Sequence, residues 1–84
     1  MLTDTQVQVL GAVNDHCEVH GQLVLDLAQP MPDLLADLGL PTDELLTAVA
    51  DLHELGLIVG MTTAEFAYPT HISGLTAEGR QELP

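Results

Sequence analysis

The sequence predicts a mainly helical α+β fold, in a single domain that spans residues 1–84. Three features predict this class. Several segments have helical periodicity, one short segment has alternating leucines, and a β-branched run is followed by a second extended segment. A chain of 84 residues has the usual size of one domain. Because 46% of the residues are apolar and only 2% are aromatic, we expect a core of Leu, Val, Ile and Ala side chains.

The first predicted helix begins after Thr3. Thr3 and Gln6 have the spacing of a capping box, in which each side chain bonds to the free backbone N–H of the other. Leu2 and Val7 are placed to form a hydrophobic staple around it. Helical spacing then predicts one buried face, and Gly21 is expected to stop the helix. That face contains Val7, Leu10, Val13 (or Asn14) and Cys17.

A short strand is predicted over residues 22–27, where Leu23, Leu25 and Leu27 alternate with Gln22, Val24 and Asp26. A continuation of the first helix is the competing interpretation. Two prolines within residues 29–32 end either element, because a proline nitrogen cannot donate a hydrogen bond.

Two more helices, separated by a tight turn, are predicted next. Pro32 suits the first turn of a helix over residues 33–38, which Gly39 closes. Beyond the turn, Thr42 is expected to cap a longer helix that ends at Gly56. The residues of that helix predicted to face inward are Leu45, Val49, Leu52 and Leu55.

A hairpin follows the longer helix. Residues 57–62 are β-branched and apolar and predict a strand, residues 63–65 a hairpin tip, and residues 66–72 the returning strand. Pro69 within that return indicates an edge position or an early break. A turn is predicted at residues 73–74, and a last short helix from Thr76 to near Leu83.

The order of these elements, with three sequence stretches, resembles the winged helix-turn-helix domains of MarR-like prokaryotic transcriptional regulators. Residues 33–40 are similar to the second helix and turn of that family, and residues 52–58 to the end of its recognition helix and the first wing strand. Residues 75–80 are similar to the motif after the wing. The resemblance implies a three-helix core, a short strand, a β-hairpin wing and a short C-terminal helix. In such families the third helix lies in the major groove of DNA and the wing contacts the backbone.

The chain is strongly acidic. It has 13 Asp and Glu residues and one basic residue, Arg80, so the formal net charge is −12. Affinity for a phosphate backbone comes from Lys and Arg side chains that displace counterions. The composition therefore argues against direct nucleic-acid binding, and it repels anionic lipid for the same reason. We expect a partner with a basic protein surface instead.

The helix that corresponds to the recognition helix has the same acidic bias. Six of its positions point away from the predicted core, and four of them are acidic, where a DNA reader would carry Arg, Lys, Asn or Gln. The six are Asp43, Glu44, Thr47, Ala50, Asp51 and Glu54. The resemblance thus supports the fold and weakens the activity usual in the family.

From these observations we predict a non-enzymatic interaction domain, related to transcription, whose acidic surface binds a basic protein partner or imitates the phosphate track of a nucleic acid. Two other interpretations stay open: a merely solvated acidic face, and a MarR-like DNA-binding regulator from a halophilic organism whose proteins are all acidic. The predicted partner-binding residues are Asp43, Glu44, Thr47, Asp51 and Glu54, joined by Asp33, Asp37 and, at the wing tip, Glu65.

One cluster in the sequence has metal-ligand chemistry, namely His16, Cys17, Glu18 and His20. In a continuous helix His16 and His20 share one face, a spacing that can hold zinc, and His53 or His71 would have to add a ligand. Two histidines near a helix C-terminus also interact favourably with the negative end of its dipole. Because nothing fixes a third or fourth ligand, we expect no metal site and no cofactor.

Cys17 is the only cysteine, so no internal disulfide can form, and we expect a cytoplasmic location. It lies on the apolar stripe of the first helix, which predicts a buried structural thiol and no catalytic role. We find no uninterrupted apolar run near the ~18 residues of a membrane span, and expect no membrane association.

Self-association is the last prediction. Several apolar residues exceed what a small core needs, and an exposed apolar patch on a small domain usually marks an interface. These residues include Leu2, Val9, Met31, Leu46, Met61 and Phe66. We therefore expect a homodimer that forms through the first and last helices.

Overall fold

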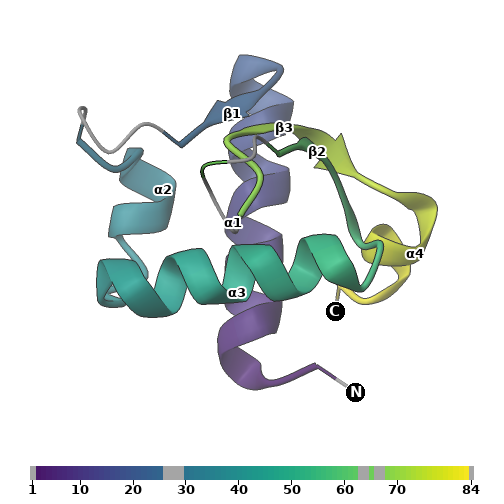
Figure 1. Cartoon of the computed structure of the whole chain (residues 1–84), viewed down its shortest axis with the longest axis horizontal. Coiled ribbons are helices and arrows are strands. Elements are labelled where there is room, and N and C mark those ends of the chain that lie inside the picture. The colour runs from purple at the N-terminus through teal and green to yellow at the C-terminus, as the bar shows by residue number, and fades with distance from the viewer. Residues whose placement is uncertain (1, 26–29, 63–64, 66–67, 84) are drawn as a thin grey trace.

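The computed structural model describes residues 2–25, 30–62, 65 and 68–83 (Figure 1). Within these residues, the chain forms four helices and a small antiparallel sheet of three strands, so the predicted α+β, mainly helical class is confirmed. The elements in chain order are α1 (Asp4–His20), β1 (Leu23–Val24), α2 (Asp33–Ala36), α3 (Thr42–Glu54), β2 (Ile58–Met61), β3 (His71–Leu75) and α4 (Ala77–Gln81). No helix of the described segments is long and apolar enough to cross a bilayer.

The predicted start and end of α1 are confirmed. The Oγ1 atom of Thr3 accepts a hydrogen bond from the backbone N–H of Gln6 at 3.1 Å, and the Oε1 atom of Gln6 accepts one from the N–H of Thr3 at 3.0 Å. Gly21 ends the helix in the left-handed conformation, and its N–H donates to the carbonyl oxygen of Cys17. Both ends of α1 are thus fixed by hydrogen bonds that the local sequence encodes.

The buried face of α1 is wider than the predicted stripe. Leu10, Val13 and Cys17 are buried as expected, whereas Val7 is only half-buried. Val9, which the sequence assigned to the surface, is completely buried, so that prediction was wrong. The reason is that α1 contacts α2, α3, β1 and β3, and a helix covered from several directions buries more than one stripe.

The helix α2 is a single turn, shorter than the predicted 33–38. The N–H groups of Leu38 and Gly39 donate three residues back, to Leu35 and Ala36, so the chain tightens into a turn after Ala36. Pro32 is the N-cap of α2 and not part of its first turn.

The helix α3 has the predicted length but different caps. Pro41 is its N-cap and Thr42 is already helical, so Thr42 does not cap the helix as predicted. Leu55 was expected to face inward, but 57% of it is exposed. Leu55 follows the last helical residue, Glu54, and the chain then turns at Gly56. Because of this turn Leu57, and not Leu55, is buried.

The sheet has the strand order β1-β3-β2, with β3 in the centre. Leu23 pairs with Ile72 on one side of β3, and Ile58 pairs with Leu75 on the other. These four side chains are buried and form the inner face of the sheet, which packs against the core. Figure 1 shows α3 crossing α1, and buried residues of both helices and of the strands belong to one core cluster.

The strands differ from their predicted bounds. The β1 pairing is confined to two residues of the predicted 22–27, and Leu27 lies outside the described residues. The returning strand was predicted over 66–72, with a turn at 73–74, but β3 runs through Ser73 and Gly74. Because β3 is paired on both sides, long-range pairing overrides the local turn preference of that dipeptide. Pro69 precedes β3 and is buried.

The helix α4 begins at the predicted cap. The Oγ1 atom of Thr76 accepts a hydrogen bond from the N–H of Gly79 at 3.1 Å. The helix ends at Gln81, because the N–H groups of Glu82 and Leu83 donate three residues back and tighten the chain into a turn.

Candidate functional site

The solvent face of α3 carries most of the predicted binding residues. Leu45, Ala48, Val49 and Leu52 bury one side of the helix, and the period of 3.6 residues places the polar residues on the other. Asp43, Glu44, Thr47 and Glu54 are exposed there, and Asp51 is half-buried. We call these five residues (Asp43, Glu44, Thr47, Asp51 and Glu54) the α3 track. Four of its five side chains are carboxylates.

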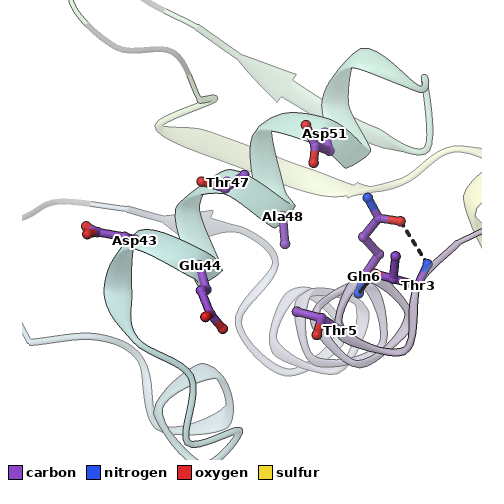
Figure 2. A pocket seen from close by; sticks show the side chains of 8 residues that line it. All are labelled: Thr3, Thr5, Gln6, Asp43, Glu44, Thr47, Ala48 and Asp51. Atoms are coloured by element: carbon purple, nitrogen blue, oxygen red, sulfur yellow. Dashed lines mark hydrogen bonds between the residues drawn. The ribbon is translucent and has the colours of Figure 1, made fainter.

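An open groove of about 480 Å³ runs between the α3 track and the first turn of α1. Its walls come from two elements (Figure 2): α1 and the residue before it contribute Thr3, Thr5 and Gln6, and α3 contributes Asp43, Glu44, Thr47, Ala48 and Asp51. Figure 2 shows the Asp43 carboxylate pointing away from α1, at the outer end of the groove. The groove therefore combines three carboxylates with hydroxyl and amide groups.

The capping box of α1 forms part of the groove wall. The two hydrogen bonds between Thr3 and Gln6 hold both side chains in fixed positions facing α3 (Figure 2). Gln6 also lines a second hollow, together with Asp51, Glu54 and Leu55. Since Gln6 and Asp51 belong to both hollows, the polar surface continues along α3 toward Glu54.

The remaining predicted residues lie apart from the groove. Asp33 is the first residue of α2 and Asp37 is its C-cap; both are exposed and line neither hollow. Glu65 is exposed in a turn between β2 and β3, and it also lines neither hollow. The structure thus brings together the α3 residues of the prediction and leaves these three carboxylates outside.

The contribution of α1 to the groove was not predicted from the sequence. Thr3 and Gln6 were identified only as caps, and Thr5 was not singled out. No local signal places them beside α3, because the packing of α1 on α3 is a tertiary contact between segments about forty residues apart in sequence.

The predicted metal-ligand cluster separates into a surface pair and a buried thiol. The ring centroids of His16 and His20 lie 4.5 Å apart. The Cys17 thiol is buried and donates to the carbonyl oxygen of Ile72 at 3.6 Å, and burial raises its pKa. Among the described residues, no three His, Cys, Asp or Glu side chains are grouped so that they could hold a metal ion, and His53 and His71 lie on other elements.

An apolar hollow of about 370 Å³ lies between α1, α2 and Leu83. Its lining residues are Val7, Gln8, Gly11, Ala12, Asp15, Leu34, Leu38 and Leu83. Of the residues named as surplus, Met61 is 73% exposed, whereas Leu2, Met31 and Leu46 pack against the core and Phe66 lies outside the described residues. The hollow belongs in part to the first helix, and the homodimer stays a prediction.

Comparison of the chain with known protein families, with curated proteins and with solved structures finds no match in any of the three.

Proposed function

We propose that this chain is a winged helix-turn-helix domain that binds a basic segment of a protein partner along the α3 track. The fold assignment is supported by the order of the elements. The helices α2 and α3 are joined by a short turn, the strands β2 and β3 follow α3 directly, and β1 pairs with the free side of β3. This is the order expected from the resemblance in residues 33–40, 52–58 and 75–80.

The observation that carries the proposed function is the charge of α3. The element that occupies the place of a recognition helix has four carboxylates on its solvent side and no Lys or Arg. A row of like charges beside a groove attracts the opposite charge and steers its approach, and Lys and Arg side chains are the donors that fit carboxylates. Thr5, Thr47 and Gln6 add polar groups that would take part in hydrogen bonds to such a segment.

The same observation disfavours nucleic acid as the ligand. The single basic residue of the chain, Arg80, lies on α4 and not on α3. A protein without Lys or Arg on its contact surface releases no counterions from DNA and would have to approach the phosphates with its carboxylates. The acidic face is therefore better suited to occupy a nucleic-acid-binding protein than to read DNA.

Fluorescence anisotropy tests this proposal. The protein is titrated into a labelled nona-arginine peptide and, separately, into a labelled random DNA duplex, at ~50 mM and then near molar salt. We expect peptide binding that weakens at high salt, because exposed charge pairs are screened, and no duplex binding at either salt.

A pair of charge-matched variants locates the peptide site. Asp43→Asn, Glu44→Gln and Asp51→Asn together remove three charges of the groove; Asp15→Asn, Glu18→Gln and Glu82→Gln remove three charges elsewhere, so both variants change the net charge from −12 to −9. At about 0.5 kcal/mol for each exposed pair, the first variant should weaken binding about tenfold more than the second. Equal weakening by both would show that the peptide responds only to total charge and would contradict the proposal.

The alternative function, a MarR-like regulator that binds DNA in a salty cytoplasm, has a different signature in the same experiment. It requires duplex binding that appears or strengthens near molar salt, where cations bridge the two acidic surfaces. Such a result would replace the proposal.

A further inference from the structure

Two histidine side chains lie side by side on the last turn of α1. His16 and His20 are four residues apart, and their ring centroids are separated by 4.5 Å with an angle of 40° between the planes. His20 is exposed and His16 is half-buried, so both rings can be reached from solvent. Cys17 lies between them in sequence but on another side of the helix, where its thiol contacts the carbonyl oxygen of Ile72.

This arrangement has the chemistry of a chelate. Zinc–nitrogen bonds to histidine are about 2.0–2.1 Å long. Two histidines at positions i and i+4 of a helix lie on one face and can bind the same zinc ion. Neutral imidazole is a ligand for Zn²⁺, Cu²⁺ and Ni²⁺. The electrostatic setting agrees, because the C-terminal turn of a helix attracts positive charge.

Cys17, although it lies between the two histidines in sequence, does not belong to the pair. Its side chain is buried, and its thiol donates to the carbonyl oxygen of Ile72. The two imidazole rings are therefore the side chains that this turn of α1 offers to a metal ion.

We propose that His16 and His20 together bind one divalent first-row transition-metal ion at the C-terminal turn of α1, with water in the remaining coordination positions. No third His, Cys, Asp or Glu joins them in the described residues, so the site is an open two-ligand chelate and not a closed structural site. The expectation of no metal site rested on the lack of a third or fourth protein ligand, which an open chelate does not require. This site is separate from the groove along α3, and its test is independent of the proposed function.

The test is calorimetric titration with Zn²⁺ in an excess of Mg²⁺, which occupies oxygen sites on this acidic protein. The decisive variant combines Glu18→His with His20→Glu. It keeps the composition and the net charge but places the two histidines two residues apart, on opposite sides of the helix. The variant His53→Gln, which removes a histidine of α3, is the control for the loss of any single imidazole.

We expect one Zn²⁺ per chain for the unmodified protein and for His53→Gln, and loss of this binding in the exchanged variant. The single change His20→Asn serves as a second variant if the exchange prevents folding, which circular dichroism reports, and it should abolish binding as well. In the unmodified protein, Cu²⁺ should show electron paramagnetic resonance couplings to two nitrogens. If the exchanged variant or His20→Asn still binds Zn²⁺, the metal is held by carboxylates and the proposal is overturned. A titration of the unmodified protein that does not saturate would also overturn it.

Discussion

The hydroxyl group of Thr76 donates a hydrogen bond to the carbonyl oxygen of Gly56 at 2.7 Å, although 20 residues separate them in sequence. The Oγ1 atom of Thr76 also accepts a hydrogen bond from the N–H of Gly79, and the Thr76 N–H donates to the carbonyl oxygen of Leu57. One residue thus joins the end of α3, the start of β2 and the first turn of α4. Gly56 itself is in the left-handed conformation, and the bonds from Gly56 N–H to His53 and from Leu57 N–H to Leu52 form a Schellman motif.

Replacing Thr76 with valine should destabilise the protein. Thr76→Val keeps the shape of the side chain but removes the bond to Gly56 and the cap of α4, and the loss of a cap alone costs about 1 kcal/mol. We expect the free energy of unfolding in urea to fall by about 1–2 kcal/mol. Thr62→Val, at an exposed position outside the helices and strands, should change it by less than about 0.5 kcal/mol. Equal effects of the two substitutions would mean that the Thr76 hydroxyl has no special role.

Two glycines in helices should respond oppositely to alanine. A Cβ added to Gly79 would lie 2.9 Å from the carbonyl carbon of Leu57 and closer still to its oxygen, whereas one added to Gly11 would meet only Leu83, at 3.9 Å. Alanine is the better helix former by about 1 kcal/mol, so Gly11→Ala should raise the midpoint of thermal unfolding. Gly79→Ala should lower it, because a backbone clash of this kind costs about 1–3 kcal/mol. For a domain of this size each kcal/mol corresponds to about 4–8 °C. A gain in stability for Gly79→Ala would contradict the close packing of α4 on Leu57.

The thiol of Cys17 should react slowly in the folded protein. It is 9% exposed, and burial raises its pKa above the usual value of 9.0, so little thiolate is present at neutral pH. Because the folded pKa is the higher one, this group contributes stability below pH 9.0 that is lost as the pH rises through the folded pKa. We expect alkylation by iodoacetamide at pH 8 to be limited by unfolding, and to accelerate in parallel with the unfolded fraction when urea is added. Rapid alkylation without urea would show that the thiol is accessible.

The titration of His16 should reveal both causes of its lowered pKa. We expect its ring resonances to titrate with a midpoint below 6.5 in nuclear magnetic resonance spectra. His20→Gln should raise that midpoint only in part, because burial is the larger cause. Since the unfolded chain binds the extra proton first, the stability that His16 contributes is complete above pH 6.5 and is lost as the pH falls through the folded pKa. A midpoint at or above 6.5 would contradict the half-buried position of the ring.

Three helix boundaries were predicted correctly from local signals in the sequence. The capping box at Thr3 and Gln6, the stop at Gly21 and the cap at Thr76 are all confirmed. Each rests on hydrogen bonds between residues at most four positions apart, so the residues that form the signal are also the residues that make the contact. The acidic residues of α3 were predictable in the same way, because helical periodicity alone separates its buried and exposed sides.

What the sequence by itself determined about this protein is therefore the α+β class, the caps at Thr3, Gly21 and Thr76, and the acidic character of α3. Only the tertiary structure decided that Val9 is buried, that β3 runs through Ser73 and Gly74, and that the first turn of α1 forms one wall of the groove. The physical reason is the same in each case. Burial from several sides, strand pairing and the walls of a groove depend on contacts between segments far apart in the chain, and no local pattern encodes which segments will meet.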